Sequence, residues 1–445
     1  MRPRPGGSDE DMRPWRRFPL LALDFPLAAA CGALGALLVL GFQLALHAIE
    51  RGLGGHGGGL VEVASRLPPW QRALAPIVGG LLAGLVLEQG RHLLRGAAEG
   101  DYLEAVRVGD GRLSLRRTLV NSLSSLCTVA SGGSIGREGA MVALSAQGGS
   151  LLARCLPMAL PRRRLLVACG IAAGWAAAYH APLAAVAFVC EVVWRRLDWR
   201  ALPALLLAAL TASLTVDRLF GLDPLYQTAP LAAPSHLALA GYCLLALLLG
   251  AASPLFMAAM ELGRHALGRL PWRLPLRMAL GGAVVGGLAW FWPQMWGNGY
   301  STVSWLLVSA PAWQLVLTLL LCKLAATAAT SGSGAVGGIF TPMLFAGAAG
   351  GALAGQLLNL ALPGWLPAGG APLVGMAAFL AATARAPALA VLMLMELSGA
   401  YSMLLPVALA AWLAARISRR LGGRFLYQDE AALKRPGPGR CWFRR

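Results

Sequence analysis

Glu138 is the residue whose surroundings point most directly to chemistry. It lies in the run Gly136-Arg137-Glu138-Gly139, and residues 111–190 contain no other Asp or Glu. A lone carboxylate in an apolar stretch is costly to place in lipid, so it is expected to face a cavity or a partner. The glycines allow a sharp turn, and a helix starting just after it would direct its positive end there. We therefore predict an anion site, occupied by the carboxylate or by a mobile anion that displaces it. The alternative is a structural pair with Arg137 at the membrane surface.

A second Gly-rich stretch, residues 337–342, offers similar chemistry. It reads Gly-Gly-Ile-Phe-Thr-Pro and includes Gly338, Ile339 and Phe340. Pro342 is tolerated in the first turn of a helix, so the stretch predicts a second helix start. Its N–H groups would face an anion while the ring of Phe340 walls the path. The alternative is a packed aromatic residue next to a Gly-rich helix contact.

Unbalanced positive charge lies near the second stretch. Residues 262–395 contain no Asp or Glu, yet Lys323 and Arg385 lie in or beside apolar runs. We expect an electropositive interior in this half, as an anion path requires. The alternative is that both cations snorkel to the surface or bind helix carboxyl ends.

The two stretches belong to an internal repeat. Residues 170–191 and 375–396 are identical at ten of 22 positions, and residues 131–141 align with 331–343 after a two-residue insertion. Both pairs occur in the same order on either side of residues 222–236, which lack a long apolar run. Paired breaks in duplicated membrane segments indicate a binding site near the midplane. The repeats can be inverted or parallel on this pattern alone.

The composition predicts the kind of element that positions these residues. Of 445 residues, 57% are apolar and 13% are charged, compared with about 25% charged in a soluble domain. Soluble enzymes, disordered scaffolds and coiled coils are therefore excluded. The apolar runs are continuous, which excludes a barrel of alternating strands. Many runs are interrupted by Gly and Pro, so we predict an all-α polytopic membrane protein of broken, tilted helices.

The net charge of +18 has a topological explanation. Arginines cluster in the tails and short loops, a pattern typical of cytoplasmic flanks rather than of nucleic-acid binding. We predict both termini in the cytoplasm, no removable signal peptide, and five segments: a basic tail (1–17), a first membrane repeat (18–221), a linker (222–236), a second membrane repeat (237–430) and a short basic tail (431–445). The eight cysteines form no Cys-x-x-Cys pair, so we expect neither a metal site nor a disulfide framework, and no cofactor.

Other function classes have weaker support. The Gly-x-Ser-x-Gly run at 132–136 and the Gly-x-Gly-x-x-Gly run at 332–337 lack the strands that their enzyme roles require. A cation or amino-acid transporter would need facing carboxylates, which the second half lacks before Glu396. An intramembrane hydrolase remains the alternative from a different class, with a serine paired to a histidine drawn from Ser134, Ser333, His180 and His265.

Taken together, these motifs resemble those of the CLC family of chloride channels and chloride/proton antiporters, in particular the bacterial branch described as voltage-gated chloride channels of the ClcB type. Residues 136–139 are similar to the first four residues of the family's Gly-Arg-Glu-Gly-Pro element, with Ala140 in place of Pro. Residues 338–342 resemble its Gly-Ile-Phe-x-Pro element, and Tyr427 its late pore tyrosine. Two further helix segments are matched by the runs Ala181-Pro182-Leu183 with Glu191 and Arg385-Ala386-Pro387 with Glu396.

The resemblance implies an inverted-repeat fold and a homodimer with one anion pathway in each subunit, in the cell inner membrane. Glu138 would be the gate, since its carboxylate competes with chloride for the outer site. Phe340 and Tyr427, with the backbone amides near Ile339 and Phe340, would line the central site. The remaining lining residues would be Gly136, Arg137, Gly139 and Gly338.

Three departures from the family pattern shape the expected mechanism. Gly100 stands where the family carries a pore serine, and Val192 stands where antiporters carry an inner proton-transfer glutamate. Only 18 residues follow Tyr427, so the cytoplasmic CBS pair of many relatives is not expected. We expect passive, channel-like chloride conduction. The alternatives are a proton-coupled antiporter with another proton route and a fluoride exporter, which Phe340 and Tyr427 disfavour.

Overall fold

The computed structural model describes residues 22–52, 59–94, 101–221, 225–228, 231–367, 369–422 and 426–427. Within them the regular structure is helical, apart from one isolated bridge between two short turns. The first-half helices are α1 (Asp24–Gly52), α2 (Gly59–Arg66), α3 (Pro69–Leu93), α4 (Tyr102–Arg107), α5 (Leu115–Ala130), α6 (Glu138–Cys155), α7 (Leu160–Tyr179), α8 (Pro182–Phe188), the π-helix η2 (Val189–Val193) and α9 (Leu202–Phe220). The second-half helices are α10 (His236–Gly268), α11 (Leu274–Phe291), the 3₁₀ turn η3 (Pro293–Met295), α12 (Tyr300–Val308), α13 (Trp313–Gly332), α14 (Phe340–Ala361), α15 (Gly370–Ala384), α16 (Pro387–Ser398), the 3₁₀ turn η4 (Tyr401–Met403) and α17 (Leu404–Arg420).

Many of these helices are long and apolar enough to cross a bilayer. Eight helical stretches in the described residues meet that condition, and three shorter apolar helices accompany them, namely Pro182–Val193, Gly370–Ala384 and Pro387–Ser398. Helices are the structure that satisfies every backbone group inside lipid without a partner strand. The prediction of an all-α polytopic membrane protein with broken helices is confirmed.

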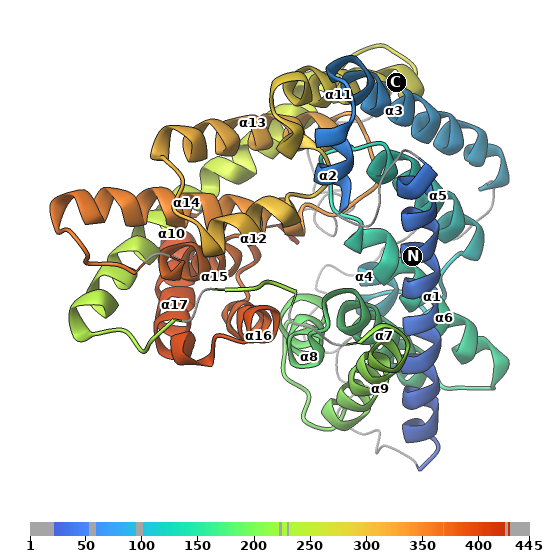
Figure 1. Cartoon of the computed structure of the whole chain (residues 1–445). Helices are drawn as coiled ribbons and strands as arrows, with labels where there is room; N and C mark the ends of the chain where they lie inside the picture. The colour runs from blue at the N-terminus through green and yellow to red at the C-terminus, as the bar shows by residue number, and fades with distance from the viewer. Residues whose placement is uncertain are drawn as a thin grey trace, which may run out of the picture.

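The helices form two groups that meet along the middle of the molecule (Figure 1). First-half helices such as α1, α7 and α9 lie on one side, and second-half helices such as α10, α14, α15 and α17 lie on the other. Helix α3 packs on α11 across this division. Glycines make that contact close: a Cβ on Gly282 would lie 2.0 Å from the carbonyl oxygen of Pro76, and one on Gly286 would lie 2.1 Å from that of Ala73. Small residues let membrane helices approach in this way.

Helices α8 and α16 contact each other where the two groups meet, and each is held by a carboxylate from the other half. Glu191 accepts hydrogen bonds from the backbone N–H groups of Ala388 (3.2 Å) and Leu389 (2.8 Å), in the first turn of α16. Glu396 accepts equivalent bonds at the start of α8, from the N–H groups of Leu183 (2.9 Å) and Ala184 (2.8 Å). A carboxylate at a helix start satisfies free N–H groups and the positive helix end. The two acids are therefore reciprocal caps.

The chain breaks before α8 and α16 are also alike. His180 and Arg385 both adopt the left-handed conformation, each with φ of 55°, and an Ala-Pro pair follows in both cases. The proline fixes the first turn of the next helix without losing a needed donor. The same residue pattern thus produces the same broken helix in both halves.

Candidate functional site

The Gly-rich stretch at residues 136–139 meets the second Gly-rich stretch, residues 337–342, through backbone hydrogen bonds. The N–H of Gly136 donates to the carbonyl oxygen of Gly338 (2.7 Å), and the N–H of Gly338 donates to that of Gly136 (3.0 Å). This antiparallel bridge stands two residues before the first residue of α6 and of α14. The structure therefore brings two helix N-termini, one from each half, to the same place.

Gly136 is needed at this junction because a side chain there has no room. A Cβ on Gly136 would lie 1.9 Å from Oε2 of Glu138 and 2.8 Å from the carbonyl oxygen of Gly338. Contacts under 3.0 Å do not occur for real Cβ atoms without a shift of the neighbour. A Cβ on Gly139 would lie 3.3 Å from the nitrogen of Gly338, a much milder crowding.

Glu138 is the first residue of α6 and is 4% exposed. Its Oε1 accepts hydrogen bonds from the hydroxyl of Thr341 (2.7 Å) and from Nδ2 of Asn298 (2.9 Å). Its buried Oε2 has no hydrogen-bond partner in the described structure. The alternative pair with Arg137 is wrong, since no ion pair between described residues joins them. The carboxylate is instead held by the second half of the chain through one oxygen.

The two helix starts beside the bridge leave peptide N–H groups without an acceptor in their own helices. The first helical bonds of α6 and α14 are donated by Met141 to Arg137 (3.3 Å) and by Met343 to Ile339 (3.0 Å). The N–H groups before them have no acceptor within their own helix. Helix starts of this kind favour negative charge, so their convergence is chemically suited to an anion.

Thr341 extends the hydrogen bonding into α7. Because the single hydroxyl proton of Thr341 is donated to Glu138, the hydroxyl of Tyr179, 3.2 Å away, donates to Thr341. The sequence contained a signal for Thr341, which lies in the second stretch, but none for Asn298. Asn298 lies 160 positions from Glu138 in an irregular segment after η3.

A series of aromatic rings runs from this point to Tyr427. Phe340 packs edge-on against Trp175 (4.7 Å between ring centroids) and Tyr179 (5.5 Å). Trp175 stacks on Phe188 (4.2 Å), and Phe188 contacts Tyr427 (5.7 Å). Phe340 and Tyr427 thus share a cluster through Trp175 and Phe188. Sequence reasoning missed both of these residues, although they lie in the repeat.

Tyr427 is tied to the first half by its backbone. Its carbonyl oxygen accepts a hydrogen bond from the guanidinium of Arg195 (3.1 Å). The preceding residue, Leu426, donates its N–H to the carbonyl oxygen of Thr383 (3.0 Å). Gly100, the remaining predicted lining residue, lies outside the described residues.

Val192 lies in the π-helix η2 and is 3% exposed. Its carbonyl oxygen and that of Val193 accept hydrogen bonds from Arg107 (2.5 and 2.8 Å). The side chain itself offers no group that could carry a proton. The adjacent acid, Glu191, is engaged as the cap of α16.

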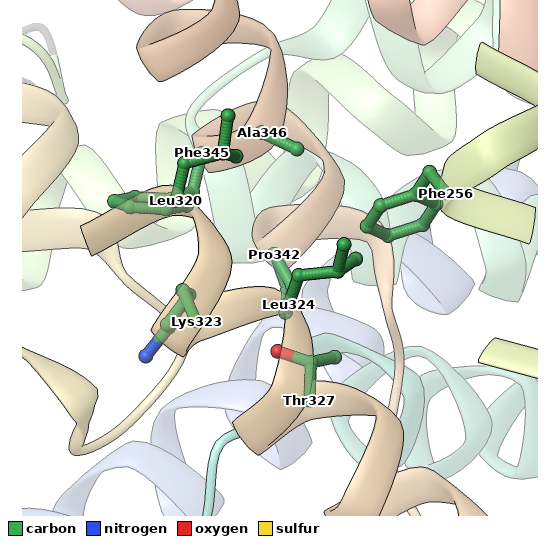
Figure 2. A pocket seen from close by; sticks show the side chains of 8 residues that line it. All are labelled: Phe256, Leu320, Lys323, Leu324, Thr327, Pro342, Phe345 and Ala346. Carbon is green, nitrogen blue, oxygen red and sulfur yellow. The ribbon is translucent and has the colours of Figure 1, made fainter. Parts of the chain in front are cut away.

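Lys323 is buried, as expected for an electropositive interior, but its charge is bound by backbone. Its ammonium donates to the carbonyl oxygens of residues 294–297. Figure 2 shows the nitrogen directed away from the small pocket that its stem lines. That pocket is formed by Phe256, Leu320, Lys323, Leu324, Thr327, Pro342, Phe345 and Ala346. It is too apolar to suggest a second ion site.

The hydrolase alternative gains no support from the serines. The hydroxyl of Ser134 is hydrogen-bonded to that of Thr327 (3.1 Å), and that of Ser333 donates to the carbonyl oxygen of Thr330 (2.8 Å). His265 pairs with Glu261 (3.0 Å).

Comparison with known proteins gives consistent results over almost the whole chain. A family model described as "Voltage gated chloride channel" matches residues 79–419. A chloride channel protein of Ralstonia nicotianae described as ClcB-like is 46% identical over 391 residues, covering 86% of this chain and 91% of that protein. The voltage-gated ClC-type chloride channel ClcB of Citrobacter koseri is 40% identical, covering 91% and 98%.

Solved structures share the fold. A slow cyanobacterial Cl⁻/H⁺ antiporter aligns with a TM-score of 0.79 at 24% identity, covering 92% of this chain and 97% of that one. A CLC-type fluoride/proton antiporter aligns with a TM-score of 0.71 at 20% identity, covering 91% and 97%.

Proposed function

This chain belongs to the voltage-gated chloride channel family, the CLC family, and from that membership we propose that it transports chloride passively through a pathway gated by Glu138. The fold is the inverted repeat of broken helices expected from the motifs. The names of the curated relatives support chloride as the substrate. The observation that carries the gating proposal is the Glu138 carboxylate, buried where two helix starts meet and held through one oxygen.

The gate works by competition between two negative charges. A carboxylate and a chloride ion 4 Å apart repel by about 4 kcal/mol at an effective dielectric constant of about 20. Such a repulsion corresponds to a population ratio of roughly 10³, so the two anions do not share the site. Protonation of Glu138 removes the repulsion and lets the side chain leave. The free N–H groups of α6 and α14 then face the incoming chloride.

The lining residues have distinct roles in this proposal. Gly136 and Gly338 bring the two backbones together, and Gly139 leaves room beside their bridge. Arg137 supplies positive charge in the same turn, and the backbone near Ile339 supplies donors. Phe340 and Tyr427 would provide the aromatic walls of the inner part of the pathway, and Gly100 belongs to the proposed lining by sequence alone.

Proton coupling is the second candidate, because the hydroxyl groups of Thr341 and Tyr179 form a hydrogen-bonded chain that leads away from the Glu138 carboxylate. Two observations favour passive transport. The rings that Tyr179 contacts belong to Trp175 and Phe340, neither of which can accept a proton, and Val192 is a buried aliphatic residue.

The deciding experiment measures chloride and proton movement together in liposomes that contain the purified protein. We expect chloride efflux to collapse an imposed chloride gradient without moving protons against their own gradient. Uphill proton movement would overturn the passive mechanism and favour antiport. The same vesicles loaded with fluoride test the fluoride alternative, and serine-reactive labelling that is lost in Ser134→Ala would support the hydrolase. Passage of sodium or potassium in place of chloride would overturn the function itself.

The proposal includes a homodimer with one pathway in each subunit, located in the cell inner membrane with both termini in the cytoplasm. Basic residues in both tails support this orientation. Cysteine labelling from each side of the membrane, at residues introduced into the tails, tests the orientation. Light scattering in detergent tests the dimer.

A further inference from the structure

We infer that Lys323 is a positioning residue for the gate: it fixes residues 294–297 so that the neighbouring Asn298 holds the Glu138 carboxylate in its buried position. The inference rests on the proposed gating by Glu138. It concerns a residue of α13 that none of the candidate motifs includes.

Lys323 makes an unusual set of contacts for a buried cation. It is 1% exposed, and none of the ion pairs between described residues includes it. Its ammonium donates to the carbonyl oxygens of Gln294 (3.4 Å), Met295 (3.0 Å), Trp296 (3.4 Å) and Gly297 (2.7 Å). A buried charge is retained only when hydrogen bonds compensate its lost hydration, and four carbonyl dipoles provide that here. The lysine therefore determines the path of this backbone segment.

The segment fixed by Lys323 leads directly to the gate. Asn298 follows Gly297, and its Nδ2 donates to Oε1 of Glu138 (2.9 Å). The Oδ1 of Asn298 accepts a bond from the N–H of Tyr300 (3.2 Å), which leaves the amide nitrogen directed at the carboxylate. Hydrogen bonds at both ends of one short segment thus connect Lys323 to Glu138.

Helix α13 braces the other side of the gate as well. Thr327, one turn after Lys323, is hydrogen-bonded through its hydroxyl to Ser134 (3.1 Å) in the segment before Glu138. The N–H of Gly297 donates to the carbonyl oxygen of Gly132 (3.2 Å), which joins the two segments. Helix α13 therefore contacts both the segment that precedes Glu138 and the segment that precedes Asn298.

Polar and charged groups from several elements lie near Glu138. Thr341 and Asn298 bond it directly. The phenols of Tyr179 on α7 and of Tyr226 interact with it electrostatically. Arg137 precedes it in the chain and interacts with Glu50 of α1 and with Tyr300. Lys323 bonds none of these side chains, so its influence on the gate must pass through the backbone that it holds.

The test compares the pH dependence of chloride flux in four proteins: wild type, Lys323→Met, Asn298→Ala and the double variant. Met has a length similar to Lys but cannot donate, so the carbonyl oxygens of residues 294–297 lose their donor. With its donor displaced, the carboxylate protonates at lower proton concentration. We expect the midpoint of the flux curve to move to higher pH by about one unit, the size expected for one lost hydrogen bond to a charged group.

Non-additivity separates positioning from a general loss of stability. We expect Asn298→Ala to give the same shift, and the double variant to show no further shift, because Lys323 acts through Asn298. Lys323→Arg, which keeps a donor, should restore part of the wild-type profile. Cys322→Ala, a neighbouring change on α13, is the matched control and should leave the midpoint unchanged. If Lys323→Met fails to fold, the pH dependence of chloride flux can still be measured in Lys323→Arg and Asn298→Ala.

An unchanged midpoint in Lys323→Met, or fully additive shifts in the double variant, would overturn the positioning role. This failure is distinguishable from failure of the proposed function. In that second case the wild type itself would show no acid-dependent chloride flux, or Glu138→Gln would leave the pH profile intact.

Discussion

Gly136 has room for a hydrogen atom and little more, which makes it a sensitive probe of the gate. In Gly136→Ala the new methyl group would occupy the place of Glu138 Oε2, 1.9 Å away. We expect the carboxylate to be displaced, with flux at neutral pH raised several-fold and its pH dependence weakened. Gly287→Ala in α11 is the matched control because a Cβ there would have nothing within 4 Å. Equal effects of the two substitutions on liposome chloride efflux would argue against displacement of the carboxylate.

The charge of the Glu138 carboxylate should make chloride flux depend on pH. In wild type, acidification should increase chloride flux, because protonation removes the charge that competes with chloride. Glu138→Gln keeps the shape and the contacts to Asn298 and Thr341 but cannot ionise. We expect sustained flux that varies little between pH 4 and pH 8, measured by chloride efflux. A variant that retains the wild-type pH response would show that another group titrates.

At the scale of the element, the reciprocal caps of α8 and α16 should contribute equally to stability. Glu191→Gln and Glu396→Gln each replace a charged acceptor of two N–H groups with a neutral one. We expect each to lower stability by about 1 kcal/mol, seen as a lower melting temperature in detergent. Glu62→Gln, at an exposed helical pair, should change little. A normal melting temperature in Glu191→Gln with an altered proton response would instead indicate a role in transport.

The elements differ in how far the sequence reveals them. Local glycine and proline patterns indicate the helix starts at Glu138 and Phe340. Such patterns also mark the breaks before Pro182 and Pro387, so these features are predictable from sequence. The helix caps could not be predicted, because Glu191 lies 197 and 198 positions from the two residues whose N–H groups donate to it. Lys323 shows the same limit: its charge predicts an electropositive interior, but only the fold reveals that four carbonyl groups bind it. Asn298 carried no signal, since a lone asparagine in a loop has many ordinary uses.

At the scale of the whole molecule, the internal repeat accounts for the two helix starts that meet at the proposed anion site. Each half provides one Gly-rich turn, one broken helix and one capping acid. The halves are nevertheless not interchangeable. The first supplies the carboxylate, while the second supplies Asn298 and Thr341, which hold it. The helix starts are therefore repeated in both halves, whereas the gating carboxylate, Glu138, comes from the first half alone.

The bridge between Gly136 and Gly338 has a consequence for how the protein can be built. Because it uses main-chain atoms from both halves, a fragment of residues 1–230 or of residues 231–445 would leave its own turn without a facing neighbour. Neither fragment alone should conduct chloride, whereas co-expression of the two should reconstitute conduction. Conduction by a lone fragment would show that complementation is unnecessary. Each half of the chain is therefore an obligate complement of the other at this bridge.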